Sequence, residues 1–434
     1  MIGAGIFTTS GFIMSEIGNA QTMLLCWFVG GVFALAGALC YGELGAIFPK
    51  AGGEYVYLRE CFGKWMGFLS GWISLIVGFS APIAAASIAF ATYLFQSLSI
   101  PLGPDIGLSL FGVHIVSISG HSVVAIVAIL ILSFFHYCSV MVGSAVQNVL
   151  TMLKIGIVVT FIVAGLCLGN GSISNFSEPL SIGSMFQGKF AVSLIFVSFA
   201  YSGWNAAAYL GAEIKNPGRN IPLALFTGTV FVMSLYLLLN VVFIYALPKG
   251  EMAGVLDVGA KSAAFLFGYN VSRYFSGAIA IGLLSVLSAM IMAGPRVYYA
   301  MSRDRVFFEL FSRVNKARGT PGYSILLQAG IAILMVATAS FDQLLVYIGF
   351  TLSLFAMMTV IGMMRLRLQQ PALRRSYRTF GYPVTPLLFI IGNLWIIIFS
   401  IKGRPLASIS GLITISLGLL VYFSFSGRKK RRGF

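Results

Sequence analysis

Long apolar stretches alternate with short polar connections along the whole of this 434-residue chain. Each stretch is continuously apolar over about 20 residues, which predicts membrane-spanning helices and excludes the alternating pattern of barrel strands. The pattern predicts twelve segments, at residues 2–15, 21–42, 65–96, 121–139, 146–168, 190–212, 222–247, 263–294, 322–340, 343–364, 383–401 and 406–425. We therefore expect an all-α integral membrane protein in which residues 1–434 form a single transmembrane domain.

The first segment, residues 2–15, is shorter than the others. A helix of this length spans about 21 Å, whereas the hydrocarbon core of a bilayer is about 30 Å thick. Its apolar pattern starts at Met1 without flanking polar residues. We therefore expect a truncated first segment, in a chain that begins late and lacks the upstream part of this helix.

The charged residues are few, at 9% of the chain, yet the formal net charge is +16. Most of the Lys and Arg residues lie on alternate connections, in clusters at residues 50–64, 215–219, 296–318, 365–378 and 428–432. This alternation is the positive-inside pattern, in which the basic connections face the cytoplasm. It predicts a multi-pass protein of the cell membrane with both termini in the cytoplasm. The basic tail is then a topology signal near anionic lipid, and no nucleic-acid partner is expected.

Two of the twelve segments are interrupted by glycine and polar residues. One interruption lies at Ile2–Phe7, and the other at Phe199–Asn205 in the sixth segment. A separation of five segments places corresponding elements on opposite sides of the membrane, and paired interruptions of this kind indicate the substrate site of a transporter. Residues 1–168 and 187–368 would then form two inverted repeats, and residues 383–425 would add two helices.

Interrupted helices expose backbone groups that need partners within the membrane. The N–H groups at the start of a half-helix suit a carboxylate, and the carbonyls at its end suit an ammonium group. Gly3 and Gly5 would let a ligand approach the backbone closely. Close packing between helices also explains a Gly-Ala-Gly sequence. The second interruption, five segments later, favours the binding site.

Three motifs together resemble those of the amino acid–polyamine–organocation transporters, and most closely their L-type neutral amino acid branch. Gly3–Phe7 matches the pattern Gly-Ser/Ala-Gly-Ile-Phe, and Tyr41–Tyr55 resembles Tyr-Ala-Glu-Leu-Gly followed by Pro-Lys-Ser/Ala-Gly-Gly. Phe199–Pro222 resembles Phe-Ala-Tyr-x-Gly-Trp-Asn followed by Glu-x-x-Asn-Pro and Arg-Asn-Ile/Leu-Pro. The likeness extends almost from end to end, and the motifs are specific in combination. The family's inner half of helix one has no counterpart before Gly3.

The resemblance implies the LeuT-like five-plus-five inverted-repeat fold with two appended helices, and transport by alternating access. The substrate-binding residues that it implies are Gly3, Ala4 and Gly5 for the carboxylate, and Phe199, Ala200 and Ser202 for the amine. It also implies that Phe199 closes over the substrate from outside, although core packing is a second interpretation. Tyr236 matches a tyrosine that hydrogen-bonds near the substrate, and a packed or interfacial aromatic explains it equally well.

Lys154 is the single charge deep inside an apolar segment. A charge there costs about 3 kcal/mol on insertion scales, so it usually faces a cavity or a partner. A lysine that bonds to carbonyls and holds helices together is one interpretation. The resemblance implies another, because Lys154 matches the fifth-helix lysine that occupies the place of a sodium ion in related sodium-coupled transporters. We therefore expect sodium independence, and leave open whether Lys154 carries a coupled proton.

The other ionisable residues suggest neither a catalytic group nor a metal site. Glu43, Glu54 and Glu213 lie at or beyond helix ends beside basic residues, and we interpret them as gate or loop ion pairs. The three histidines lack the i, i+4 spacing of a helical metal site, and the five cysteines lack metal-ligand spacing. We expect no cofactor, no metal and no enzyme activity. A channel is also disfavoured, because no polar pore ring or filter motif is visible.

The function expected from these features is sodium-independent transport, as an exchanger, of small to medium neutral L-amino acids. A proton-coupled carrier, or one for cationic amino acids or polyamines, is the alternative. A second cation on the substrate would favour an acidic group in the site, and no Asp or Glu lies in the middle of a segment. Animal L-type members that pair with a glycoprotein carry an external cysteine between helices three and four. Residues 96–120 contain no cysteine, so we expect no disulfide-linked heavy chain and a prokaryotic monomer or weak homo-oligomer.

Overall fold

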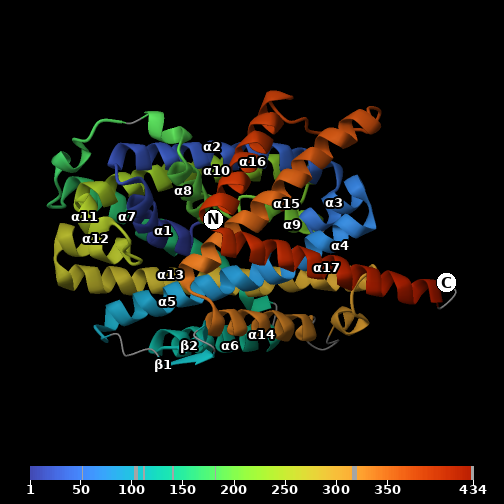
Figure 1. Ribbon diagram of the computed structural model, residues 1–434, viewed down its shortest axis with the longest axis horizontal. Coiled ribbons are helices and arrows are strands. Elements are labelled where there is room, and N and C mark those ends of the chain that lie inside the picture. Colours follow the sequence, from blue (N-terminus) through green and yellow to red (C-terminus); the bar gives the residue numbers. More distant parts are fainter. Residues whose placement is uncertain are drawn as a thin grey trace.

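The computed structural model describes residues 1–50, 52–101, 106–110, 113–138, 141–180, 182–314 and 320–431, and these residues are mainly helical (Figure 1). The α-helices are α1 (Ala4–Ile17), α2 (Ala20–Ile47), α3 (Glu54–Phe62), α4 (Lys64–Ile73), α5 (Ala81–Leu98), α6 (Gly120–Cys138), α7 (Met141–Cys167), α8 (Gly188–Tyr201), α9 (Ala206–Tyr209), α10 (Pro217–Ala246), α11 (Lys249–Met252), α12 (Val258–Phe267), α13 (Tyr269–Arg303), α14 (Gly322–Thr338), α15 (Phe341–Gln369), α16 (Val384–Gly403) and α17 (Pro405–Arg431). Two strands, β1 (Ile106–Leu110) and β2 (Val113–Ile118), form an antiparallel pair.

The predicted apolar segments correspond to helices of the structure. Within the described ranges, eight helices are long and apolar enough to cross a membrane, and four shorter apolar helices accompany them. The shorter ones are Thr151–Cys167, Gly188–Tyr201, Val258–Phe267 and Gly322–Thr338. The prediction of a helical, multi-pass membrane protein is confirmed.

The structure differs from the predicted segments in two places. The segment predicted at 263–294 is wrong at its start, because its first residues belong to α12 and the chain turns at Gly268 before α13 begins. Gly268 has φ of +88°, a conformation that side-chain-bearing residues rarely adopt. The pattern also did not predict the strand pair before α6, in which the register shifts between Leu108 and Ser109.

The segment predicted at 65–96 changes helix type in its middle. Helix α4 passes directly into a π-helix at Ser74–Ser80 and then into α5. Such turns are rare and frequently mark functional sites. The hydroxyl of Ser80 donates a hydrogen bond to the carbonyl of Leu75 at 2.6 Å, which links the two ends of this π-helix.

The helices pack into a bundle in which α2 lies along α10 and α5 lies along α13, while α1 crosses α8 in the interior (Figure 1). In the apolar stretch of Lys64–Leu98, 78% of the residues are buried inside the protein, whereas the corresponding share for Pro405–Ser424 is 17%. The continuous helical segment from α4 to α5 therefore lies at the centre of the bundle. Helix α17 lies at the periphery, where its exposed Leu and Ile side chains would contact lipid.

The two ends of the bundle carry different elements. One end, which we call the α3 end, carries α3, α9 and the last residues of α17, at the right of Figure 1. The opposite end, which we call the α12 end, carries α11 and α12. An ion pair between Arg59 and Asp304 ties α3 to the end of α13. At the α12 end, Lys249 Nζ lies 2.8 Å from a carboxylate oxygen of Glu178.

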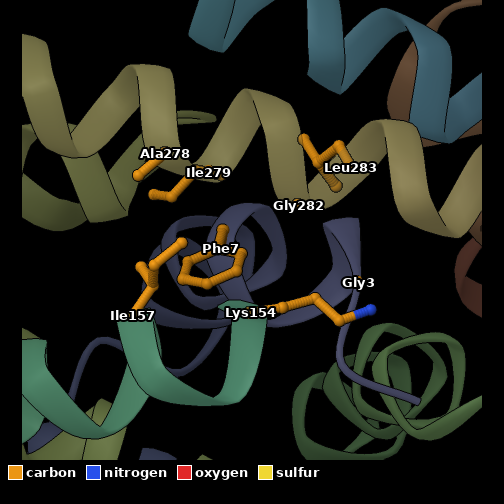
Figure 2. A pocket seen from close by; sticks show the side chains of 8 residues that line it. All are labelled: Gly3, Phe7, Lys154, Ile157, Ala278, Ile279, Gly282 and Leu283. Carbon is orange, nitrogen blue, oxygen red and sulfur yellow. The ribbon is translucent and has the colours of Figure 1, made fainter. Parts of the chain in front are cut away.

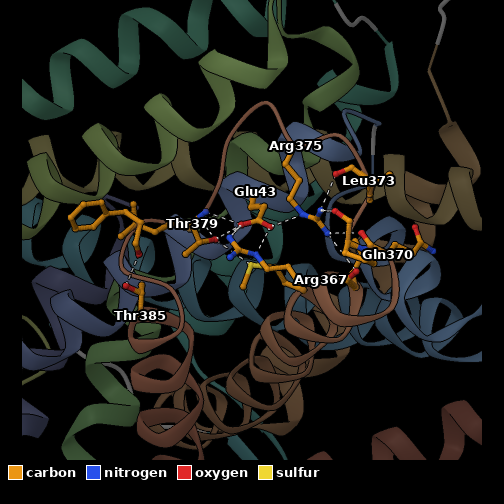
Figure 3. A network of polar contacts seen from close by, with 12 residues as sticks. Glu43, Arg367, Gln370, Leu373, Arg375, Thr379 and Thr385 are labelled. Atoms are coloured by element: carbon orange, nitrogen blue, oxygen red, sulfur yellow. Dashed lines mark hydrogen bonds and ion pairs between the residues drawn. The ribbon is translucent and has the colours of Figure 1, made fainter.

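A buried ion-pair network fixes the α3 end of α2 (Figure 3). The Glu43 carboxylate is fully buried and accepts a hydrogen bond from Arg367 Nε at 2.8 Å. It also accepts hydrogen bonds from the backbone N–H and the hydroxyl of Thr379, at 2.7 and 2.8 Å. Arg375 Nε lies 3.3 Å from the same carboxylate. The network joins α2 to α15 and to the connection that follows it. Glu43 thus forms an ion pair, as predicted, but its partners Arg367 and Arg375 are not the basic residues nearest to it in sequence.

Candidate functional site

The sixth apolar segment is broken as its sequence predicts. Helix α8 ends at Tyr201, and α9 begins only at Ala206. Between them, Ser202 has an extended ψ of 144° and Gly203 has φ of +87°, which requires glycine. The break therefore leaves the last carbonyls of α8 without the helical N–H partners that a continuous helix would supply.

Helix α1 begins beside this break. Gly3 is extended and caps the helix, so Ala4 and Gly5 lie in its first turn, where backbone N–H groups have no partner within the helix. A Cβ atom on Gly5 would lie 2.4 Å from the Cα atom of Ala200. The absence of a side chain at Gly5 is thus what allows α1 to cross the last turn of α8. A Cβ atom on Gly3 would make only an ordinary contact, 3.4 Å from Val286.

Tyr236 of α10 joins the start of α1 to the end of α8. Its side chain is fully buried, and its hydroxyl lies 3.0 Å from the carbonyl oxygen of Ala200 and 2.9 Å from that of Met1. One hydroxyl hydrogen can be donated to only one of these acceptors at a time. One turn later, Asn240 donates to the carbonyl of Tyr236 at 2.7 Å and accepts from the hydroxyl of Ser10 at 2.7 Å. The arrangement holds α1, α8 and α10 together through polar contacts.

The predicted amine-binding residues all lie at the α8 end of the break. Phe199 and Ala200 occupy the last turn of α8 and are buried, with 6% and 3% of their surface exposed. Ser202 follows the helix and donates its backbone N–H to the Phe199 carbonyl at 2.9 Å. The structure therefore brings together Gly3, Ala4, Gly5, Phe199, Ala200, Ser202 and Tyr236. A helix start and a helix end meet there, which suits a ligand that carries one negative and one positive group.

Lys154 of α7 lies next to the same helix start. It lines a small cavity of about 10 Å³, room for about one water molecule, together with Gly3 and Phe7 of α1 and residues of α13. Figure 2 shows the Lys154 nitrogen directed toward Gly3, and the aliphatic part of the side chain packs over Gly282. Within the described parts of the chain, the Lys154 nitrogen has neither an ion pair nor a side-chain hydrogen bond. A fixed positive charge is thus placed between α1, α7 and α13.

Sequence reasoning missed three aromatic residues around this site. Trp27 and Tyr201 pack on Tyr236, with ring centroids 5.5 and 5.0 Å away. Tyr93 of α5 donates its hydroxyl to the carbonyl of Phe7 at 2.7 Å, which ties α5 to α1. A buried tyrosine in an apolar helix usually needs a polar partner, and this is the signal that could have singled out Tyr93.

The acidic residues do not all behave as predicted. The interpretation of Glu54 as an ion pair is wrong, because its carboxylate accepts hydrogen bonds from the Tyr41 hydroxyl at 2.6 Å and from Asn205 Nδ2 at 2.9 Å. The neighbouring Arg59 pairs with Glu60 and Asp304 instead. The side chain of Glu213 lies outside the described residues.

No group of three metal-ligating side chains occurs in the part of the chain that the structure describes. His136 is buried, and its Nε2 atom lies 2.8 Å from the hydroxyl of Ser288. A second cavity of about 310 Å³ is lined by His136, Arg296 and residues of α13 and α14. None of its lining residues belongs to either helix break, so this cavity is separate from the candidate site.

The sequence is similar to known amino acid transporters over its whole length. It is 29% identical, over 435 residues, to the serine/threonine exchanger SteT of Bacillus subtilis (strain 168), covering 100% of this chain and 94% of that protein. It is 28% identical to the large neutral amino acids transporter small subunit 2 of Rattus norvegicus, over 98% of this chain and 77% of the relative. It is 29% identical to the human b(0,+)-type amino acid transporter 1, over 98% and 85% of the two chains.

The model of one protein family, described as amino acid permease, matches residues 1–425. This match covers the start of α1, the break between α8 and α9, Lys154 and Tyr236. With the multi-pass helical fold and the whole-length relatives, it establishes membrane transport and not enzymatic catalysis as the activity. The chain belongs to the amino acid permease family of the amino acid–polyamine–organocation superfamily, whose members are membrane transporters of amino acids.

Proposed function

We propose that this protein is a sodium-independent exchanger of small to medium neutral L-amino acids that works by alternating access. The observation that carries the proposal is the contact of the α1 start with the α8 end, where Gly5 meets Ala200 and Tyr236 reaches the Ala200 carbonyl. An amino acid has its carboxylate and its ammonium group on one carbon atom. The start of one helix and the end of another, both close to the Tyr236 hydroxyl, are suited to bind both groups at once.

In this proposal the backbone of the α1 start binds the substrate carboxylate and the end of α8 binds its amine. The carboxylate would accept hydrogen bonds from the N–H groups of Gly3, Ala4 and Gly5. The ammonium group would donate to carbonyls of the residues that end α8, namely Phe199, Ala200 and Ser202. Tyr236 would hold these breaks in register, since its hydroxyl lies within hydrogen-bond distance of a carbonyl on each. Phe199 would close over the substrate.

The preference for neutral substrates follows from the charges near the helix breaks. A cationic side chain buried in the site would need an acidic partner. Among the described residues, the buried carboxylates are Glu43, held by Arg367, and Glu54, held by Tyr41 and Asn205. Both lie toward the α3 end. The names of two relatives, a serine/threonine exchanger and a large neutral amino acid transporter, agree with this preference.

Lys154 would supply the charge that a sodium ion supplies in related transporters. Its nitrogen is directed toward Gly3, the extended residue that precedes the first turn of α1 (Figure 2). A covalently attached cation at this place can hold exposed carbonyls in position and needs no ion from solution. This is the physical basis for the proposed sodium independence.

The arrangement of the chain in the membrane completes the proposal. Residues 1–168 and 187–368 would be the inverted repeats, and residues 383–425 the two added helices. The α3 end would face the cytoplasm, because the basic clusters at 50–64 and 365–378 lie there. We propose a monomer or weak homo-oligomer in the cell membrane without a disulfide-linked heavy chain, since residues 96–120 contain no cysteine.

The test is uptake of labelled neutral L-amino acids into proteoliposomes in sodium-free buffer. Vesicles loaded with unlabelled amino acid are compared with empty vesicles. Exchange predicts rapid uptake only in loaded vesicles, and no change when sodium is added. Uptake into empty vesicles that follows an inward proton gradient would replace exchange by proton-coupled transport. A preference for labelled arginine or a polyamine over alanine, serine and leucine would overturn the neutral substrate class.

A further inference from the structure

Glu54 is a buried carboxylate that joins three elements at the α3 end. It is the first residue of α3, and only 5% of its surface is exposed. Its Oε1 atom accepts hydrogen bonds from the hydroxyl of Tyr41 on α2 and from Nδ2 of Asn205, the residue that caps α9. One side chain therefore connects α2 and α3 to the second half of the broken sixth segment.

Helix α9 is held against α3 by further close contacts. The backbone N–H of Gly52 donates to the carbonyl of Tyr209 at 3.3 Å. A Cβ atom on Gly53 would lie 2.7 Å from the ring of Tyr209, so the start of α3 touches this ring directly. Within the break itself, the Trp204 ring packs edge-on to Tyr41, with centroids 4.7 Å apart. Movement of α9 away from α2 and α3 must therefore separate Asn205 from Glu54.

Among the described residues, the groups that face Glu54 provide no positive charge. Three phenol groups interact electrostatically with the Glu54 carboxylate, namely those of Tyr41 on α2, Tyr57 on α3 and Tyr209 on α9. Within the described ranges, Glu54 forms no ion pair, because Lys50 and Arg59 pair with Glu60, and Arg59 also with Asp304. Burial without a cation disfavours the ionised form of a carboxylate.

We propose that Glu54 is a proton-binding positioning residue for transport, whose protonation holds α9 closed against α2 and α3 and whose ionisation favours opening of the α3 end. The inference rests on the proposed transport function. The closed contact keeps the carboxyl group out of water, which suits the neutral form. Opening would hydrate the group, which suits the ionised form, and this gain from hydration outweighs the loss of the hydrogen bond from Asn205. The proton comes from water at the α3 end and returns to it.

The direction of the pH effect follows from the pKa of Glu54. Burial raises this pKa from its usual 4.5 to about 6, although the hydrogen bonds from Tyr41 and Asn205 oppose the increase. The closed arrangement thus binds the proton more tightly than a hydrated, open one. Closure is favoured as pH falls through about 6, and the bias is lost as pH rises above it. Linkage then makes the open-to-closed ratio roughly eightfold lower at pH 5 than at pH 7.5.

The experiment compares the pH profile of exchange in wild type, Glu54→Gln and Glu60→Gln between pH 5 and 7.5. Labelled serine or leucine is used, because these substrates keep one ionic form over this range. Wild-type exchange should increase several-fold with pH. Glu54→Gln keeps an acceptor for Tyr41 and Asn205 but cannot ionise, so its profile should be flat, near the wild-type rate at pH 5. Glu60→Gln, on the same helix but in exposed ion pairs, should keep the wild-type profile.

A second measurement does not depend on transport. Infrared difference spectra of the purified protein should show a carboxylic acid band that appears as pH falls, with a midpoint near 6, and that is missing in Glu54→Gln. Asn205→Ala removes one hydrogen bond to the ionised form, so it should move this midpoint to higher pH. An equal pH slope in wild type and Glu54→Gln, or a band that persists in Glu54→Gln, would overturn the inference. Absence of any amino acid exchange in wild type would instead overturn the proposed function, and the infrared titration would still decide the protonation of Glu54.

Discussion

Gly5 of α1 and Ala200 of α8 meet backbone to backbone, at a distance that leaves no room for a methyl group on Gly5. A Cβ atom there would be 2.4 Å from the Cα and 2.8 Å from the Cβ of Ala200. Both atoms belong to or adjoin helix backbone, so neither can move aside as the end of a flexible side chain could. The crossing of the two interrupted segments thus depends on one missing side chain.

The first prediction concerns Gly5→Ala and its neighbour Gly3→Ala. Overpacking costs about 1–3 kcal/mol, so Gly5→Ala should lower the thermal midpoint in detergent and nearly abolish exchange. Gly3→Ala meets Val286 at an ordinary contact distance of 3.4 Å and should fold with the wild-type midpoint. Size-exclusion profiles and thermal melts of both variants check the difference. Equal midpoints for the two variants would contradict the role assigned to the crossing.

The second prediction concerns the Tyr236 hydroxyl. Tyr236→Phe keeps the ring against Trp27 and Tyr201 but removes the hydrogen bond to Ala200 or Met1. A single hydrogen bond contributes about 0.5–1.5 kcal/mol, so exchange should decrease by about 3- to 10-fold, mainly through an increase in KM. Tyr274→Phe is the matched control, because Tyr274 is 83% exposed and should lose nothing. Wild-type kinetics in Tyr236→Phe would show that the hydroxyl has no role in transport and that only the ring of Tyr236 contributes.

The positions of the helices and of the α8–α9 break could be predicted from sequence because they are local properties. Hydrophobic length indicates a span, and Ser202-Gly203 within an apolar run indicates an interruption. The start of α13 could not be found in this way. The apolar residues that end α12 continue the hydropathy of the next helix, and only the backbone of Gly268 separates them.

The contacts between elements could not be predicted, since they join residues far apart in the chain. Basic residues nearby in the sequence suggested an ion pair at Glu54. In the fold Arg59 reaches Asp304 at the end of α13, and Glu54 turns inward to Tyr41 and Asn205. The close approach of Gly5 to Ala200 has the same origin. A glycine shows that space is needed, but not which element occupies it.

The third prediction concerns Lys154. Lys154→Ala removes the cation beside Gly3 and should reduce exchange more than about tenfold while the protein remains folded, because a charge in the membrane interior is kept for function and not for stability. Lys189→Ala, an exposed lysine at the start of α8, should exchange at the wild-type rate. Unchanged exchange in Lys154→Ala would remove this residue from the mechanism.

The fourth prediction concerns the stability of the network around Glu43. Its carboxylate is fully buried between two arginines and Thr379, so Glu43→Gln leaves positive charges without a counter-charge. Loss of one partner of a buried ion pair costs about 3–5 kcal/mol. The thermal midpoint of Glu43→Gln in detergent should therefore fall well below that of wild type.

A matched substitution separates burial from charge in this fourth case. Glu60 is also paired with basic residues, but at the surface of α3, where an ion pair is worth about 0–1 kcal/mol. Glu60→Gln should accordingly leave the midpoint nearly unchanged. Arg367→Lys keeps the positive charge but loses the bidentate hydrogen bonding of Arg367 to Glu43. The thermal midpoint of this variant should therefore lie between those of wild type and Glu43→Gln. If Glu43→Gln and Glu60→Gln melted alike, the attachment of α15 to α2 would have to depend on apolar packing and not on this carboxylate.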